Sequence, residues 1–170
     1  DLLKDAGRDV IAVGKIFDIF DGEGVTEKIK TTGNTNGIAF TKALQTRDFE
    51  GLAFVNLVDF DMLYGHRRDV AGYAAAATEF DKFVADFIPG MREGDILMVT
   101  ADHGCDPSYT KTTDHTREYV PYLICGKGVK PGVDLGTKLC FGTIAQTICD
   151  YLGVDASTLD GQSVLSDILK

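Results

Sequence analysis

Short apolar runs alternate with segments of helical periodicity along this chain. Candidate buried strands are the continuous apolar runs at residues 9–13, 52–58, 95–101 and 119–125. Apolar residues recurring at three- and four-residue steps predict helices at 34–44, 69–88 and 141–152, with shorter helical turns at 2–6 and 164–169. The segment 17–24, with two glycines and three acidic residues, is expected to be a loop.

This order of elements predicts an α/β fold. The candidate strands are too far apart in the chain for hairpins, which favours a mainly parallel sheet. Strands that are apolar throughout, rather than alternating, belong to sheets whose two faces are both covered by helices. We therefore expect a single α/β unit with helices on both faces of a mainly parallel sheet.

The composition and net charge of the chain argue against nucleic-acid and membrane partners. The chain has 170 residues, 44% of them hydrophobic, which is enough for one well-packed core. Its net charge of −9 argues against a nucleic-acid-binding surface. No apolar run reaches membrane-spanning length, and no basic-then-apolar leader is visible, so no membrane partner is expected. The chain starts at Asp1 without a methionine, and we interpret it as part of a longer protein.

The four cysteines show neither paired CxxC spacing nor the spacing of a secreted disulfide scaffold. We expect them to be reduced and mostly buried. Cys105 differs from the others because it lies among candidate metal ligands. A role for Cys105 as ligand or nucleophile is left open.

Histidine and aspartate gather after two of the candidate strands. Ligands of open α/β sheets bind outside the carboxyl ends of strands, and acidic residues follow the runs 52–58 and 95–101 there. The potential metal ligands are Asp61, His66, Asp102, His103 and His115, which include every histidine of the chain. Imidazole and carboxylate suit Mn²⁺ or Zn²⁺. Five donors are enough for two ions, or exceed the needs of one ion. Two ions about 4 Å apart would favour phosphoryl transfer.

Several cationic side chains lie close to these candidates in the sequence. Arg67, Arg68 and Arg117 could hold a substrate phosphate, or could neutralise the neighbouring acids. Lys15, after the first strand, is a weaker phosphate-binding candidate, and the glycines around it do not form a Walker loop. Asp59 and Asp114 are as readily explained as cap or turn residues.

The motifs resemble a known family. Ala101-Asp102-His103-Gly104 resembles the metal-binding signature of the alkaline phosphatase superfamily. The closer resemblance is to the phosphopentomutase family, on the segments 14–16, 22–26, 56–61, 64–69 and 114–121. That resemblance implies an alkaline-phosphatase-like core and a cytoplasmic isomerase of nucleotide and pentose phosphate metabolism. Such an enzyme interconverts ribose 1-phosphate and ribose 5-phosphate, and their 2-deoxy forms.

The resemblance also implies a cofactor and an activator. Family members use two Mn²⁺ ions and a phosphorylated threonine, which a sugar bisphosphate activator charges. By matching motifs, Asp102 and His103 would hold one manganese ion. Asp61, His66 and His115 would hold the other.

Family members are longer than this chain. Their amino-terminal part carries the threonine nucleophile, another ligating aspartate and a separate cap domain. Residues 1–170 are therefore expected to be the carboxyl-terminal portion of the catalytic core, with no catalytic nucleophile located and no mutase activity alone. The alternatives are another superfamily enzyme (a cofactor-independent phosphoglycerate mutase or a phosphatase), an inactive metal-binding fragment, or a structural domain without a ligand.

Overall fold

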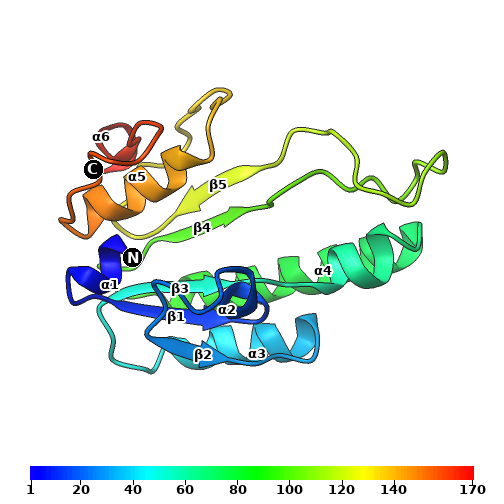
Figure 1. Ribbon diagram of the computed structural model, residues 1–170, viewed down its shortest axis with the longest axis horizontal. Coiled ribbons are helices and arrows are strands. Elements are labelled where there is room, and N and C mark those ends of the chain that lie inside the picture. The colour runs from blue at the N-terminus through cyan, green and yellow to red at the C-terminus, as the bar shows by residue number, and fades with distance from the viewer.

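Three parallel strands form the central sheet. The computed structural model describes residues 1–170, and in it β1 (Asp9–Val13) lies between β2 (Glu27–Ile29) and β3 (Gly51–Val55) (Figure 1). The β1–β3 register runs from Asp9 opposite Gly51 to Val13 opposite Val55. Because β1 has a strand on either side, it is the most deeply buried of the three, and residues 10–13 are all buried.

Helices occupy most of the remaining regular structure. They are α1 (Leu2–Asp5), α2 (Ile16–Ile19), α3 (Asn34–Leu44), the π-helical turn η1 (Phe60–Gly65), α4 (Val70–Phe87), the 3-10 turn η2 (Ile88–Gly90), α5 (Gly142–Tyr151) and α6 (Leu165–Ile168). The helices predicted from periodicity are confirmed, with α3 matching its predicted bounds. None of these helices combines the length and apolar character needed to cross a membrane.

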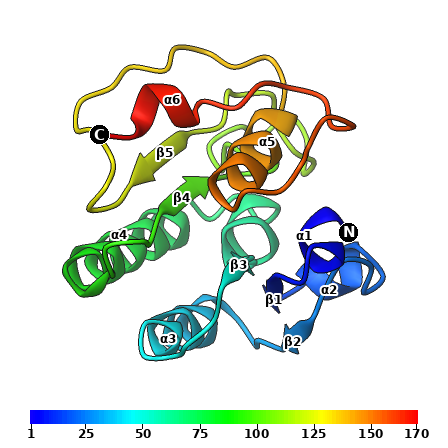
Figure 2. The ribbon, with the colours of Figure 1, turned by 90° about the vertical axis from the view of Figure 1, so that its left-hand side faces the viewer.

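Helices cover both faces of the β2-β1-β3 sheet, as predicted. Alternate side chains of a strand point to opposite faces. Val10 of β1 packs in one cluster with Leu3 of α1 and Cys149 of α5. Ile11 and Val13 of β1 pack in a second cluster with Leu44 of α3. Figure 2 shows α1 and α3 on opposite sides of β1 and β3. The α/β class and the doubly covered sheet are therefore confirmed.

The last two strands form a separate antiparallel pair. β4 (Leu97–Thr100) pairs with β5 (Tyr122–Cys125), with Leu97 opposite Cys125. The expectation of one mainly parallel sheet thus holds for β1, β2 and β3 and needs correction for β4 and β5, which form a second sheet. A parallel crossover normally runs through a helix, and residues 101–121 contain none. The chain instead returns through a long loop, which brings β5 back beside β4 in the opposite direction.

Two short elements escaped the sequence pattern. α2 extends into the segment 17–24 that was expected to be a loop. β2, with the sequence Glu-Lys-Ile, lies at the edge of its sheet and its residues are only half-buried. A strand of three residues, two of them charged, contains no apolar run from which it could be predicted.

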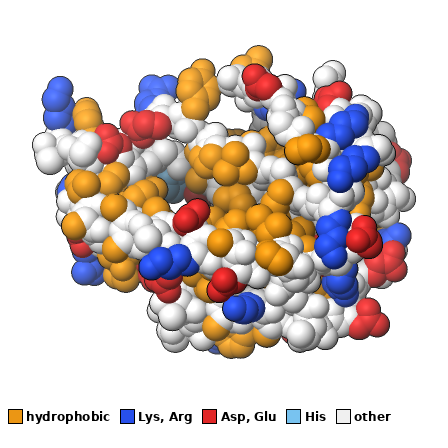
Figure 3. Space-filling model, turned by 180° about the vertical axis from the view of Figure 1, so that it is seen from behind, with side chains coloured by type: hydrophobic (Ala, Val, Ile, Leu, Met, Phe, Trp, Pro, Cys, Tyr) orange, Lys and Arg blue, Asp and Glu red, His pale blue; other side chains and the backbone are white.

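β3 and β4 each keep an unpaired edge. No backbone hydrogen bond joins the two sheets, and every residue of β3, β4 and β5 is at least partly accessible. Phe54 of β3 is 41% exposed and Leu123 of β5 is 62% exposed. Figure 3 shows hydrophobic side chains gathered across one face of the molecule. The strands that precede the candidate ligands are therefore less buried than β1.

Truncation of the central strand should be costly. Ile11 is 1% exposed, and Ile11→Ala is expected to lower the free energy of unfolding by about 2–5 kcal/mol. The matched control is Ile19→Ala, because Ile19 is 61% exposed, and a change within about 0.5 kcal/mol is expected there. Urea unfolding followed by circular dichroism measures both. Equal losses in the two variants would contradict this account of the core.

Candidate metal centre

The π-helical turn η1 brings two of the predicted ligands together. The backbone N–H of His66 donates to the carbonyl oxygen of Asp61 at 3.0 Å, which is a hydrogen bond across five residues. In an α-helix, residues five apart would point about 140° away from each other. The wider π turn returns the chain to the same side after five residues. Nε2 of His66 consequently lies 3.3 Å from Oδ1 of Asp61.

A third donor comes from the loop between β4 and β5. Nε2 of His115 lies 3.4 Å from the same Oδ1 of Asp61. One ligand atom from each of Asp61, His66 and His115 lies within 4.8 Å of the other two. Asp61, His66 and His115 therefore form a three-donor group, although Asp61 and His115 are 54 positions apart in the sequence.

The chemistry of this group fits a divalent cation. Oδ1 of Asp61 is inaccessible to solvent and has no hydrogen-bond partner. A carboxylate oxygen buried in this way is unfavourable unless a partner compensates the lost hydration. Two imidazole nitrogens and a carboxylate oxygen are the donor types that Zn²⁺ and Mn²⁺ accept. A bound cation would supply the partner that Asp61 lacks.

His66 is oriented by a backbone carbonyl. Its Nδ1 lies 2.6 Å from the carbonyl oxygen of Thr113. Since a carbonyl can only accept, Nδ1 carries the proton, and the lone pair of the neutral ring is then on Nε2. Metal-binding histidines are commonly oriented by such a hydrogen bond. The ring nitrogen that faces Asp61 is thus the one able to bind a cation.

The other two predicted ligands lie beside this group. The ring of His103 stacks on that of His115, with centroids 3.7 Å apart and planes at 22°. Oδ2 of Asp102 is 3.6 Å from Nε2 of His103, and the Asp102 side chain is 77% exposed. The structure therefore gathers three imidazoles and the Asp61 carboxylate. Asp102 stays outside the three-donor group, and its role as a ligand stays a prediction.

Two glycines allow the segments around the centre to approach closely. The N–H of Thr116 donates to the carbonyl of Gly104 at 3.0 Å, and a Cβ on Gly104 would lie 2.8 Å from the backbone nitrogen of Glu118. A Cβ on Gly65 would lie 2.5 Å from Sγ of Cys105. Neither glycine has a positive φ. Close packing, rather than turn conformation, accounts for both.

Cys105 behaves as a half-buried thiol. All four cysteines are free, and the expectation that they are mostly buried is wrong, since only Cys149 is buried. Cys105 and Cys125 are half-buried, Cys149 is buried and Cys140 is exposed. Burial is the main cause that raises the pKa of the Cys105 thiol, and the negative charge of Asp61 raises it further. Cys105 Sγ is not part of the three-donor group.

This environment predicts slow labelling of Cys105. A raised pKa keeps the thiol protonated at neutral pH, and the thiolate is the form that reacts. We expect iodoacetamide to modify exposed Cys140 well before Cys105 at pH 7, as measured by peptide mass spectrometry over time. Modification of Cys105 first would instead support the open alternative of a reactive thiol.

The four predicted phosphate-binding side chains have different environments. Nζ of Lys15 is exposed and lies 2.7 Å from Sδ of Met62, next to Asp61 in the sequence. Arg67 and Arg117 are exposed, and neither forms a side-chain hydrogen bond or ion pair. Arg68 differs from the other three, because each of its N–H groups donates to a backbone carbonyl. The donors of Arg68 are thus engaged within the protein, its role in phosphate binding stays a prediction, and no sequence pattern predicted these contacts.

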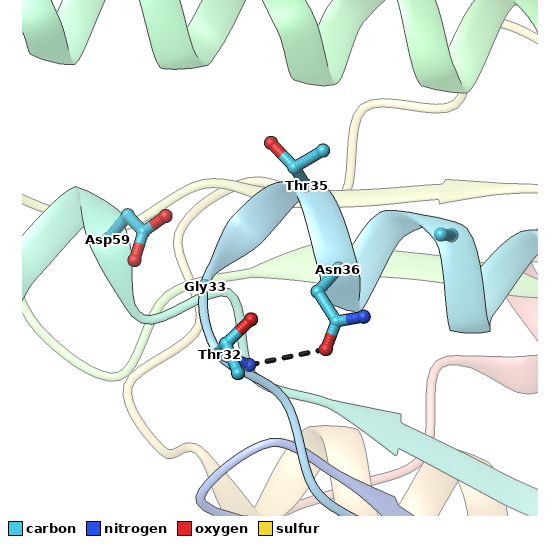
Figure 4. Close-up of a pocket in the computed structure, with 6 residues that line it drawn as sticks. Thr32, Gly33, Thr35, Asn36 and Asp59 are labelled. Atoms are coloured by element: carbon cyan, nitrogen blue, oxygen red, sulfur yellow. Dashed lines mark hydrogen bonds between the residues drawn. The ribbon is translucent and has the colours of Figure 1, made fainter.

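Asp59 acts as a cap rather than as a ligand. Its Oδ2 accepts from the backbone N–H of Asn34 at 2.7 Å, and its own N–H donates to Oδ1 of Asn34 at 2.9 Å. The carboxylate thereby caps α3 from a different part of the chain. It also borders a shallow polar pocket lined by Thr32, Gly33, Thr35, Asn36, Ala39 and Asp59 (Figure 4). The negative charge of Asp59 disfavours an anionic ligand in this pocket.

Comparison with known proteins supports the metal chemistry. A sequence model described as the metalloenzyme superfamily matches residues 3–156. Phosphopentomutase from Acetivibrio thermocellus is 52% identical over 169 residues, 99% of this chain. Phosphopentomutase from Lachnoclostridium phytofermentans is 52% identical over 168 residues, also 99% of this chain. That from Symbiobacterium thermophilum is 50% identical over 170 residues, all of this chain.

The chain covers only part of each of these relatives. The matched region is 43% of the length of each of the three proteins. The described residues therefore correspond to less than half of a phosphopentomutase of that size.

Proposed function

Because this chain belongs to the metalloenzyme superfamily, we propose that it is the carboxyl-terminal part of the catalytic core of a longer phosphopentomutase, here called the parent protein. The proposal is supported by about 50% identity to phosphopentomutases along almost the whole chain. The observation that carries it is the three-donor group of Asp61, His66 and His115. The amino-terminal core segment and the cap domain would come from outside residues 1–170.

The proposed reaction is the interconversion of ribose 1-phosphate and ribose 5-phosphate, and of their 2-deoxy forms. It makes the parent protein an isomerase that moves a phosphoryl group between two oxygens of one sugar. A phosphothreonine enzyme, charged by a sugar bisphosphate, would divide one difficult displacement into two easier ones. The threonine would also lie outside this chain. Keeping water out of the site would separate the mutase reaction from phosphatase activity.

The proposed cofactor is a pair of Mn²⁺ ions. Asp61, His66 and His115 would hold one of them, and Asp102 and His103 would contribute to the other. When bound, the ions supply charge that polarises the phosphoryl oxygens and stabilises the transition state. The mixed carboxylate and imidazole donors, without a thiolate, suit Mn²⁺ as well as Zn²⁺.

The remaining tasks fall to this chain's own side chains. Asp61 contributes a negative charge at the centre, and the Thr113 carbonyl keeps the Nε2 of His66 directed at it. Lys15 lies exposed beside Met62, where its ammonium group would attract a phosphate dianion. Arg67 and Arg117 are exposed and have free guanidinium groups for the same purpose. These three cations remain the proposed substrate-binding residues.

A substrate comparison tests the function. The parent protein, loaded with Mn²⁺ and supplied with a sugar bisphosphate, is incubated separately with ribose 1-phosphate and with 3-phosphoglycerate. We expect conversion of ribose 1-phosphate to ribose 5-phosphate and no turnover of the glycerate. Turnover of the glycerate alone would assign the chain to a phosphoglycerate mutase instead. Mass spectrometry of the parent protein for a phosphothreonine tests the covalent step independently.

A further inference from the structure

Backbone carbonyls around the metal centre accept hydrogen bonds from every N–H group of Arg68, and Sγ of Cys105 lies 4.0 Å from its Nη1. Nη1 donates to the carbonyls of Gly65 at 3.0 Å and Asp106 at 3.1 Å. Nε donates to Thr112 at 2.9 Å, and Nη2 donates to Thr112 and Asp114. A guanidinium group has five N–H donors, and here each of them has a carbonyl acceptor. The side chain therefore joins the end of η1 to the loop between β4 and β5.

The bound carbonyls lie directly before a proposed ligand. Arg68 holds the carbonyls of Thr112 and Asp114, and Nδ1 of His66 holds that of Thr113. Three consecutive carbonyl groups immediately before His115 are thus fixed from the η1 side. On the other flank, the Gly104–Thr116 bridge fixes the residue after His115.

The loop has little else to order it. Residues 106–114 contain no helix or strand, and none of them is buried. A segment without buried apolar contacts opens at low free-energy cost unless hydrogen bonds restrain it. Arg68 supplies most of the hydrogen bonds that tie residues 106–114 to the rest of the protein, beside one from His66 and one to Thr116.

The backbone of Arg68 is itself unusual. Its φ is 55°, in the left-handed region that non-glycine residues other than Asn and Asp seldom occupy. Such a conformation persists when the surrounding contacts impose it. An asparagine at this position would tolerate the same backbone while lacking the guanidinium group, which makes it an informative replacement.

We infer that Arg68 is a positioning residue for the metal centre. Its contacts hold residues 106–114, and with them His115, in the cation-binding conformation before the cation arrives. The inference rests on the proposed metal centre and is independent of the sugar substrate. Without the guanidinium contacts, only a fraction of molecules would have His115 in place, and the apparent dissociation constant rises by the inverse of that fraction. Loss of such supporting contacts typically weakens metal binding about 10-fold to 100-fold.

Manganese binding to the parent protein tests this inference. The variants are Arg68→Asn, Arg68→Lys and, as the control, Lys111→Asn, because Lys111 is an exposed cation of the same loop that forms no side-chain hydrogen bond or ion pair. The dissociation constant of Mn²⁺ is measured by titration calorimetry or by electron paramagnetic resonance, and the melting temperature of each chelator-treated protein is measured beside it. We expect Arg68→Asn to bind Mn²⁺ about 10-fold to 100-fold more weakly, with a melting temperature close to that of the unaltered protein.

Arg68→Lys retains the charge but not the planar set of donors, so its binding should also be weakened. Lys111→Asn should bind Mn²⁺ as the unaltered protein does. Tight binding by both Arg68 variants would overturn the inference, as would an Arg68→Asn protein that fails to fold beside an Arg68→Lys protein that binds Mn²⁺ normally. Absence of Mn²⁺ binding by the unaltered protein would overturn the proposed metal centre itself, and the inference with it.

Discussion

Replacing Asp61 by asparagine in the parent protein is expected to lower turnover by about a thousandfold or more while leaving the metal-free protein at least as stable. Bound metal ions stabilise such transition states by several kcal/mol, and each 1.36 kcal/mol corresponds to a factor of ten in rate. Asp61 is the only carboxylate of the three-donor group, so its loss removes the negative charge that holds the cation. Steady-state assays with ribose 1-phosphate at several Mn²⁺ concentrations measure this effect.

The stability part of this prediction separates a ligand from a structural residue. Oδ1 of Asp61 is buried without a hydrogen-bond partner. A neutral amide at this place removes a carboxylate that has one buried oxygen without a partner, so the melting temperature of the metal-free protein should not fall. The matched control is Asp69→Asn, because Asp69 caps α4 through a bond to Gly72 and asparagine caps equally well. An Asp61→Asn protein with normal turnover, or with a large loss of metal-free stability, would contradict the assignment.

Removal of the metal should abolish activity and lower thermal stability together. A ligand that binds only the folded state, present at a hundred times its dissociation constant, adds about 2.7 kcal/mol to the free energy of unfolding. For proteins of this size range, that is a rise in melting temperature on the order of 5 °C. We expect treatment with a chelator to eliminate turnover, and added Mn²⁺ to restore both turnover and the higher melting temperature.

The Asp61→Asn protein provides the control for this second experiment. Its melting temperature should rise clearly less with Mn²⁺, because the three-donor group is incomplete while Asp102 and His103 are unchanged. A shift of equal size in both proteins would show that the ion acts elsewhere. Full activity after exhaustive chelation would refute the metal-dependent mechanism.

Much of the fold was predictable because apolar patterning is strong where both faces of the sheet are covered. The run at 9–13 became β1, and the periodic segment 34–44 became α3. The direction of β5 was not predictable from its own residues, since an apolar strand reads the same in a parallel and an antiparallel pair. The absence of a helical pattern at 101–121 was the one available signal, and it points to the antiparallel return that the structure has.

The candidate site was predictable in its residues but not in its arrangement. Three scarce histidines near aspartates identified the donors, because residue type alone determines which side chains can bind a cation. The arrangement depends on η1, on backbone carbonyls such as that of Thr113, and on the guanidinium of Arg68. Backbone groups are the same in every sequence, so no pattern of side chains reveals which carbonyl will be used.

The π-helical turn has a consequence for how this segment can vary among related proteins. Met62 and Leu63 within it are 44% and 38% exposed, so their side chains are replaceable by other residues that suit a helical turn. The number of residues between Asp61 and His66 cannot change in the same way, because one more or one fewer would rotate the imidazole away from the carboxylate. Insertions and deletions should therefore be excluded from residues 61–66 even though Met62 and Leu63 accept substitution, so that the length of the turn is inherited more strictly than the identity of these two residues.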